Sequence, residues 1–206
     1  MLKQLKPALL MTLLLCVLTG VIYPGVVTGL ARALFPRQAE GSLVTVNGRV
    51  VGSALIGQPF TRPEYFHPRP SAAGAGYDAA SSSGTNKGPT DAKLADTLVA
   101  EAIASAVATD GATKGAIPSD MVTASASGLD PDISPANAYL QVARVARARH
   151  ADSIAVRLLL DGHVTGRQFG FFGEPRVNVL LLNIAVDSAF PLTTQPAVVT
   201  SRPVNK

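Results

Sequence analysis

The sequence contains few charged residues, few aromatic residues and a single cysteine. Charged residues make up 16% of its 206 positions and aromatic residues 5%, whereas a typical soluble domain has about 25% charged residues. Hydrophobic residues still make up 47% and the mean hydropathy is +0.27, so apolar residues must be concentrated in part of the chain. This composition excludes a wholly disordered chain, which needs low hydrophobicity and high net charge.

The residues that would build a disulfide, a metal site or a familiar catalytic motif are also missing. Cys16 has no partner cysteine, and His67, His150 and His163 are too far apart in sequence for metal-ligand spacing. We find no phosphate-binding loop, no His-Glu-x-x-His zinc motif and no Gly-x-Ser-x-Gly nucleophile motif. The sequence therefore predicts no catalytic residue and no metal site.

What the sequence does contain is an uncharged apolar run over residues 7–31, bounded by Lys6 and Arg32. A helix of that length would extend about 37 Å, enough to cross the hydrocarbon core of a bilayer. A cleavable signal peptide is the alternative, with a poor cleavage site at residues 31–33. The run is longer than the apolar part of a typical signal peptide, so we expect an uncleaved transmembrane helix at 7–31.

The charges beside this run predict its orientation. Lys3, Lys6 and the α-amino group lie on its N-terminal side, whereas Arg32 and Arg37 follow it, a slight bias toward a cytoplasmic N-terminus at residues 1–6. The large C-terminal part is then expected outside the cytoplasm, in the periplasm. Lys3, Lys6 and Arg32 also account for three charges of the net +4, so the rest of the chain is nearly neutral and nucleic acid is not an expected partner.

Within the apolar run, small residues and one proline have predictable effects. Gly20, Gly25 and Gly29 would let a partner helix approach closely. Tolerance of glycine in a lipid-exposed helix is the alternative explanation. Pro24 is expected to kink the helix.

Residues 32–187 predict one mixed α/β extramembrane domain, so the whole chain is of the α+β class behind a single N-terminal transmembrane helix. β-Branched residues on both sides of Asn47 and Gly48 predict a hairpin with a type I′ turn. Residues 57–89 are rich in Gly, Pro, Ser and Ala, which is typical of a long loop or linker.

Further helices and strands are expected after residue 89. Thr90 is a candidate cap for a helix to about Thr109, and Ser134 with Pro135 predicts a helix to about His150. The apolar segments 154–160 and 177–186 predict strands, the second of them central. Residues 188–206 contain three prolines and several threonines and predict a disordered tail.

Six polar or glycine-rich stretches follow one another behind the apolar run, at residues 52–60, 65–71, 83–86, 123–135, 141–149 and 173–183. The most specific are Ser-Gly-Leu-Asp-Pro at 127–131 and Pro-Arg-Val-Asn-Val-Leu at 175–180. In this order they closely resemble the C subunit of the bacterial Kdp-type potassium-transporting ATPase, the KdpC family, over about residues 5–187. The sequence departs from the family at Asp132, where histidine is usual, and at Ala126 and Thr85, where glycine and serine are common.

The resemblance implies a non-catalytic subunit of a high-affinity, ATP-driven potassium uptake pump in the cell inner membrane. The implied partners are a channel-like potassium-binding subunit, a P-type ATPase subunit, a small single-span subunit and membrane lipid. The family is described as a catalytic chaperone that stabilises the complex and raises the ATP affinity of the ATPase subunit. This chain is then expected to hold no covalent cofactor and to meet ATP only in complex with that subunit.

The resemblance also implies nucleotide-related residues, because a glutamine after the Ser127–Gly128 motif has been likened to the signature of ABC transporters. Here that glutamine is Gln141, and Arg144 and Ala148 share its helix face at i+3 and i+7, so Arg144 would add attraction for phosphate. The structural alternatives are a water-exposed Gln141, a solvated helix end at Arg144, and a turn with positive φ at Gly128.

The predicted periplasmic location of the domain conflicts with a direct contact between Gln141 and ATP. ATP is cytoplasmic, so direct contact with Gln141 would require a cytoplasmic domain. A nucleotide effect of a domain outside the cytoplasm would have to pass through the partner.

A membrane-anchored extracytoplasmic hydrolase is the alternative function. Its nucleophile would be a serine from residues 81–83 or 125–127. It would need one of the three histidines as a base.

Overall fold

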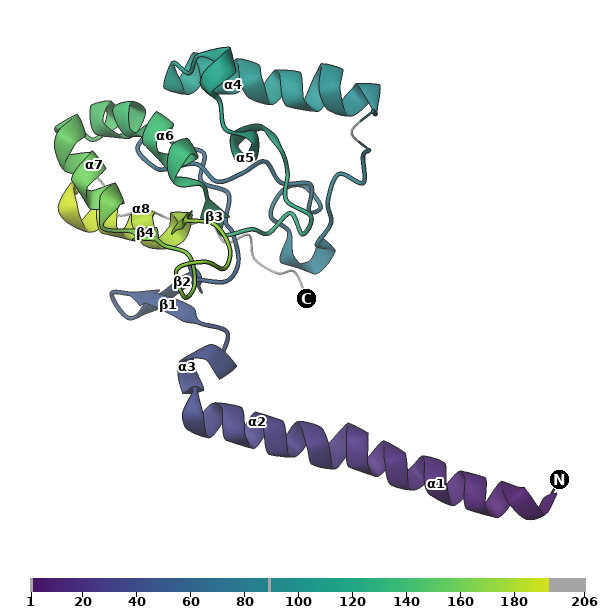
Figure 1. Ribbon diagram of the computed structural model, residues 1–206. Coiled ribbons are helices and arrows are strands. Elements are labelled where there is room, and N and C mark those ends of the chain that lie inside the picture. Colours follow the sequence, from purple (N-terminus) through teal and green to yellow (C-terminus); the bar gives the residue numbers. More distant parts are fainter. Residues whose placement is uncertain (1, 89, 193–206) are drawn as a thin grey trace. The chain divides into compact units, whose positions relative to one another are not determined.

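The computed structural model describes residues 2–88 and 90–192. It divides the chain into two compact units, Met1–Val50 and Val51–Lys206. Figure 1 shows a long helical segment at the N-terminus and a mixed set of helices and short strands in the second unit. This confirms the predicted class, a long apolar helix followed by an α+β domain.

The first unit is dominated by one continuous helical run. It consists of η1 (Leu2–Gln4), α1 (Leu5–Val17), the π-helical η2 (Leu18–Ile22) and α2 (Tyr23–Leu34). Among the described residues, Leu5–Leu34 is the one helix long and apolar enough to cross a membrane, with a mean hydropathy of 2.2. At 1.5 Å per residue it is about 45 Å long, and it includes the predicted segment 7–31.

The irregularity in this helix lies directly before Pro24. In η2 the hydrogen bonds join residues five positions apart instead of four, so that the Tyr23 N–H donates to the Leu18 carbonyl. Proline has no N–H and its ring crowds the preceding turn, so a π-helical turn relieves both problems within a continuous helix.

After the short helix α3 (Pro36–Ala39), the chain forms the predicted hairpin of β1 (Leu43–Val46) and β2 (Arg49–Ser53). Asn47 and Gly48 have φ angles of +51° and +76°, as a type I′ turn requires.

The second unit contains the remaining elements. They are η3 (Ala79–Ser81), η4 (Leu94–Val99), α4 (Ala100–Asp110), η5 (Lys114–Ala116), α5 (Ser119–Val122), β3 (Asp132–Ile133), α6 (Pro135–Ala148), α7 (Ser153–Asp161), β4 (Val164–Thr165), β5 (Arg176–Asn178) and α8 (Val179–Ala189). The strands form an antiparallel sheet in the order β3–β5–β4, and Val177 of β5 pairs with Ile133 and Val164.

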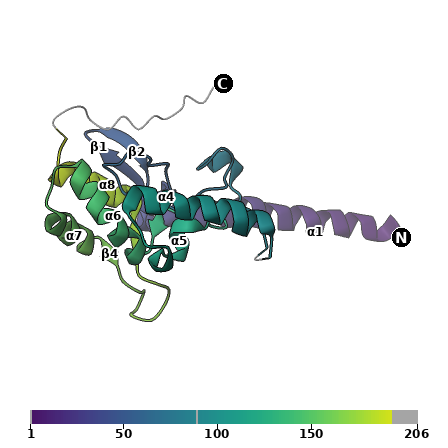
Figure 2. The ribbon, with the colours of Figure 1, turned by 90° about the horizontal axis from the view of Figure 1, so that it is seen from above.

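Helices rather than strands supply most of the core. α6 packs against α7 and α4, and α8 packs against α7; Figure 2 shows α6, α7 and α8 together on one side of this unit. The largest fully buried apolar side chains in the core are Phe66, Val145, Val156, Leu160, Val177, Leu182 and Val186.

The two predicted strands over 154–160 and 177–186 are wrong. The first segment is α7, capped by the Asp152 carboxylate, and its buried Val156 and Leu160 are four residues apart, as on one helix face. Only the start of the second segment is a strand, because the Asn178 side chain accepts a hydrogen bond from the Leu181 N–H and begins α8. A short apolar run does not distinguish a buried strand from a buried helix by composition.

The predicted helices are confirmed with small changes at their ends. α6 begins after the Ser134 cap, as expected, and ends at Ala148. The helix expected to be capped by Thr90 is instead capped by the Asp91 carboxylate, which accepts from the Leu94 N–H. It ends at Asp110, and Gly111 follows with φ +68°. α8 continues to Ala189, two residues into the predicted tail, and residues 193–206 of that tail lie outside the described residues.

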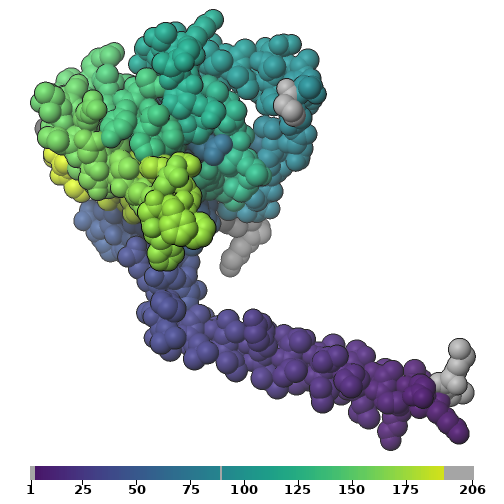
Figure 3. All heavy atoms as spheres, viewed as in Figure 1, coloured from purple at the N-terminus to yellow at the C-terminus, as the bar shows by residue number. Residues whose placement is uncertain are grey.

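Residues 57–89 contain only the short η3 among their described positions, as their composition predicts. This loop is nevertheless partly buried, since Tyr65, Phe66 and Ala73 belong to the interior. A second loop, between β4 and β5, is a lobe on the surface in Figure 3, where it is yellow-green.

Candidate functional site

The predicted residue Gln141 lies on the inner face of α6, not on a water-exposed face. The helix begins where the Ser134 hydroxyl accepts a hydrogen bond from the Asn137 N–H and Pro135 occupies the first turn. From this start, Asn137, Gln141 and Arg144 follow at helical spacing and all three are buried, with Gln141 only 1% exposed.

The amide of Gln141 uses all its hydrogen-bonding capacity inside the protein. Its Oε1 accepts from the His67 N–H at 2.6 Å and from Arg144 Nη2 at 2.7 Å. Its Nε2 donates to the His67 carbonyl at 3.1 Å and to Asn137 Oδ1 at 2.8 Å. A glutamine amide has two acceptor lone pairs and two donor hydrogens, so no group remains free for a ligand.

Arg144 is equally committed to the interior. Its Nε donates to Asp110 Oδ1 at 2.7 Å, and Nη1 donates to the carbonyls of Pro63 and Tyr65 at 2.6 and 2.7 Å. Both side chains of the Arg144–Asp110 ion pair are nearly inaccessible to solvent. The predicted face of Gln141 and Arg144 therefore exists, but the solvated helix end proposed as an alternative for Arg144 is wrong.

Arg149 and Asn183 bind the same loop from two other positions. Arg149 Nε donates to the Glu64 carbonyl at 2.9 Å, and its guanidinium lies 4.8 Å from the centroid of the Tyr65 ring. Asn183 of α8 accepts from the Phe66 N–H at 2.8 Å and donates to the Phe66 carbonyl at 2.9 Å. Residues 63–67 are thus held by charged and amide side chains of α6, its C-terminal turn and α8.

This environment shifts the pKa of two side chains in the loop. Burial, followed by the positive charge of Arg144, lowers the pKa of His67, which favours the neutral imidazole. Burial, followed by the negative charge of Asp187, raises the pKa of Tyr65, whose hydroxyl donates to that carboxylate at 3.2 Å. Both groups are therefore uncharged at neutral pH.

The other predicted residues, Ser127 and Gly128, connect two loops. The Ser127 carbonyl accepts from the Ser83 N–H and the Ser82 hydroxyl at 3.0 and 2.9 Å. The Gly128 carbonyl accepts from the Ser71 hydroxyl at 2.6 Å. This geometry matches the structural explanation, a turn that leads toward α6.

Gly128 is required by both conformation and space. Its φ is +67°, and an added Cβ would lie 2.6 Å from the Ser83 carbonyl oxygen and 2.7 Å from the Ala73 nitrogen. A side chain at this position would be strained and would clash with backbone that the same turn holds in place.

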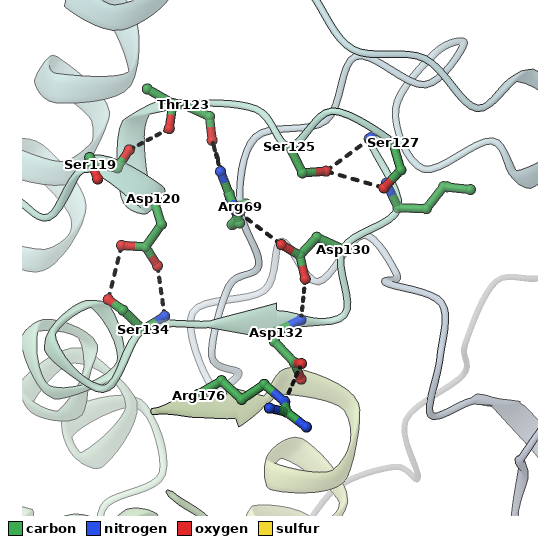
Figure 4. A network of polar contacts seen from close by, with 12 residues as sticks. Arg69, Ser119, Asp120, Thr123, Ser125, Ser127, Asp130, Asp132, Ser134 and Arg176 are labelled. Carbon is green, nitrogen blue, oxygen red and sulfur yellow. Dashed lines mark hydrogen bonds and ion pairs between the residues drawn. The ribbon is translucent and has the colours of Figure 1, made fainter. Parts of the chain in front are cut away.

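Ion pairs and hydrogen bonds continue along the segment from the turn to α6, as Figure 4 shows. Arg69 Nη1 donates to Asp130 Oδ2 at 2.9 Å. Asp120 accepts from the Ser134 N–H at 2.7 Å and from the Ser134 hydroxyl at 2.9 Å. Across the parts of the chain that the structure describes, no buried side-chain nitrogen or oxygen lacks a hydrogen-bond partner.

Asp132, where the resembling family usually has histidine, lies in β3 opposite Asn178 of β5. Arg176 Nε lies 3.0 Å from Asp132 Oδ2. Burial raises the pKa of Asp132, while the Arg176 charge opposes the shift. Asp132 therefore forms an ion pair with the guanidinium of Arg176 on the neighbouring strand.

The predicted nucleotide-related residues do not converge on one cavity. Ser127 borders one surface hollow of about 620 Å³, and Gln141 borders another of about 520 Å³. Arg69 lines both hollows, yet its guanidinium is paired with Asp130.

The serines proposed for a hydrolase are not paired with histidine in the described part of the chain. The Ser125 and Ser127 hydroxyls accept from the N–H groups of Gly128 and Leu129 within their own turn. Ring nitrogens of His67 and His163 lie within hydrogen-bonding distance of backbone carbonyls. Nor do three His, Cys, Asp or Glu side chains gather closely enough to hold a metal ion among residues 2–88 and 90–192.

Sequence reasoning placed Gln141 and Arg144 on one helix face, and the structure confirms this, since Arg144 Nη2 donates to Gln141 Oε1. It did not identify Asp110 as the partner of Arg144, since a single aspartate 34 positions away carries no local signal. A composition typical of a linker also gave no sign that residues 63–67 are the most heavily bonded part of the loop.

The three glycines of the apolar helix line no site within the structure. An added Cβ at Gly20, Gly25 or Gly29 would meet nothing within 4 Å. Because glycine has no Cβ, the helix surface is open at these positions.

These features define a class of protein, an α+β domain carried on one long apolar N-terminal helix. The family model of the K+-transporting ATPase C chain, KdpC, matches residues 5–188. The potassium-transporting ATPase KdpC subunit of Gemmatimonas aurantiaca is 61% identical over 189 residues, which cover 91% of this chain and 94% of that protein. The corresponding subunit of Koribacter versatilis is 51% identical over 192 residues, covering 93% and 98% of the two chains, and that of Geobacter sulfurreducens is 53% identical over 191 residues, covering 92% and 100%.

The chain therefore belongs to the KdpC family of potassium-transporting ATPase subunits. This confirms the resemblance drawn from the motifs at 127–131 and 175–180.

Proposed function

We propose that this chain is a non-catalytic accessory subunit that stabilises an ATP-driven potassium uptake pump and raises the ATP affinity of its P-type ATPase subunit. The observation that carries the proposal is the family match over residues 5–188. The buried side chains of α6 support the absence of independent catalysis, because Gln141 and Arg144 are engaged in holding the fold. The partners we propose are a channel-like potassium-binding subunit, the ATPase subunit and a small single-span subunit.

We further propose that the N-terminus is cytoplasmic and that the domain lies in the periplasm. Support comes from Lys3 and Lys6 on the short N-terminal side of the apolar helix and from the large size of the domain on the other side. In this orientation the second unit is separated from cytoplasmic ATP by the membrane.

The effect on nucleotide affinity then passes through the partner as a coupling between distant sites. The saturated amide of Gln141 supports this route, because a direct contact with nucleotide would have to break hydrogen bonds to His67, Asn137 or Arg144. ATP is bound only in the assembled complex and by the ATPase subunit.

Docking in the membrane would use the part of the helix that contains Gly20, Gly25 and Gly29. Their open surfaces support this assignment, since small residues let two helix backbones approach closely. Replacing Gly25 with leucine would then weaken copurification of the chain with the larger subunits.

The experiment that tests the function compares the purified pump with and without this chain. We expect potassium-stimulated ATP hydrolysis to be lost when the chain is omitted and to return when it is added back, with a lower KM for ATP. Unchanged activity and unchanged KM in its absence would contradict the proposal. ATP hydrolysis by the isolated chain at enzyme-like rates would contradict it as well.

A further inference from the structure

The loop between β4 and β5 exposes three phenylalanine side chains. Phe169, Phe171 and Phe172 are 88%, 64% and 57% exposed, although large aromatic side chains are normally buried in a folded domain. They are three of the seven phenylalanines in the chain. We call residues 166–174 the aromatic tip.

The aromatic tip has a defined conformation. The backbones of Gln168 and Phe172 exchange two hydrogen bonds of 2.9 Å, which makes a small hairpin. Phe169 and Gly170 turn the chain with φ angles of +53° and +82°. Arg167 Nη2 lies 2.6 Å from Glu174 Oε2, so an ion pair closes the base.

The rings themselves form an apolar surface. The centroids of Phe171 and Phe172 are 4.2 Å apart. Figure 3 shows the yellow-green segment standing out from the surface of its unit, and Figure 2 shows the loop after β4 reaching away from the helices. An exposed and preformed apolar projection of this kind indicates a binding surface.

We propose that the aromatic tip inserts into the interfacial region of the lipid bilayer that holds the chain's own apolar helix. Residues 35–50 connect that helix to the second unit, and even fully extended they span only about 55 Å. A domain of this size has a radius of gyration of about 15 Å, so its whole surface stays within reach of the bilayer.

The chemistry of the tip favours lipid over a protein partner. Phenyl rings carry no hydrogen-bonding group, whereas the residues that dominate protein–protein binding are chiefly Trp, Tyr and Arg. The tip projects outward, so its rings can enter the boundary between the headgroups and the acyl chains. Within the tip the charges of Arg167 and Glu174 cancel, so apolar burial, and not attraction to anionic lipid, would hold the tip in the membrane.

The test uses the full chain reconstituted in phosphatidylcholine–phosphatidylglycerol vesicles. The protein contains no tryptophan, so Phe169→Trp introduces a single fluorophore at the tip. We expect a blue-shifted emission and a roughly twofold or greater loss of intensity with lipids brominated near the headgroup end of their acyl chains. Leu158→Trp is the matched control, because Leu158 is 66% exposed on α7 of the same unit, and its emission should stay unchanged.

A further variant separates insertion from simple proximity. Adding Phe171→Ser and Phe172→Ser to Phe169→Trp should restore most of the tryptophan fluorescence that brominated lipid quenches, because the remaining ring alone binds lipid weakly. The proposal is overturned if Phe169→Trp is not quenched by brominated lipid, or if Leu158→Trp is quenched equally. It is also overturned if the tip becomes shielded only after the other pump subunits are added, since that result would identify a protein partner.

Discussion

The side chain of Gln141 and the backbone of His67 form a reciprocal pair of hydrogen bonds, with the amide accepting from the His67 N–H and donating to its carbonyl. Asn183 forms the same pair with the preceding residue, Phe66. Two adjacent residues of a long loop are therefore paired by amides from two helices, α6 and α8, much as they would be by neighbouring strands. This arrangement turns a segment without regular structure into part of the core.

Removing the amide of Gln141 is expected to destabilise the fold. Gln141→Ala removes the hydrogen-bond partner of the His67 N–H and carbonyl and of Asn137 Oδ1, and we expect a loss of about 3 kcal/mol in the free energy of unfolding. Urea unfolding of the full chain in detergent, followed by circular dichroism, measures this loss. The control is Gln38→Ala at an exposed glutamine, which should change stability by less than about 0.5 kcal/mol.

The amides of Gln141 and Asn183 should be energetically coupled because they hold adjacent residues. Gln141→Ala already frees the loop at His67, so Asn183→Ala then disrupts fewer intact contacts beside it. The double variant should therefore lose about 1 kcal/mol less free energy of unfolding than the sum of the losses in the single variants. A double-mutant cycle from the same unfolding curves gives this number. Strictly additive losses would mean that the two pairs act independently.

Gly128 should tolerate a side chain less well than Gly111, although both have a left-handed backbone. Their φ angles are +67° and +68°, but a Cβ at Gly128 would lie 2.6 Å from the Ser83 carbonyl oxygen, while a Cβ at Gly111 would meet nothing within 4 Å. Gly111→Ala should cost about 1 kcal/mol through strain, and Gly128→Ala about 2 kcal/mol or more beyond that. Thermal unfolding of the two variants compares them directly. Equal losses of stability would show that the short contact with the Ser83 carbonyl oxygen adds no cost at Gly128.

Acidification should destabilise the protein through His67. Burial and Arg144 lower its pKa in the folded state, so the unfolded chain binds the proton more readily. The contribution of His67 is complete above the unfolded pKa of about 6.5 and decreases as the pH falls from there toward the lower folded value. Between pH 7.5 and 5.5, His67→Gln should lose less stability than the unchanged protein. If the free energy of unfolding fell equally with pH in both proteins, His67 would not be the group that titrates.

The sequence predicted those parts of the fold that have a local chemical signal. The Asn47–Gly48 turn, the Ser134 cap and the positive φ of Gly128 each follow from the residue itself, and the apolar helix follows from its length. α7 and α8 were mistaken for strands because a run of apolar residues suits either structure when it is buried. The spacing of the buried Val179, Leu182 and Val186 becomes informative only when Asn178 is recognised as a cap.

The candidate site was harder to predict because its partners lie far apart in sequence. Gln141, Arg144 and Gly128 were singled out, but nothing in their neighbourhood indicates that His67 and Asp110 complete their hydrogen bonds. A polar residue on a predicted helix is expected to face water, and its burial depends on long-range partners that satisfy it. The resemblance identified the family, while the structure revealed that these residues hold the fold.

The central claim is that the second unit works outside the cytoplasm, away from the nucleotide. A topology measurement tests it most directly, with a reporter active only outside the cytoplasm fused after Lys206 and a reporter active only inside fused at the same position. The account predicts that the outside reporter is active and the inside reporter is silent. An active inside reporter with a silent outside reporter would contradict it. That result would place Gln141 and Arg144 in the same compartment as ATP.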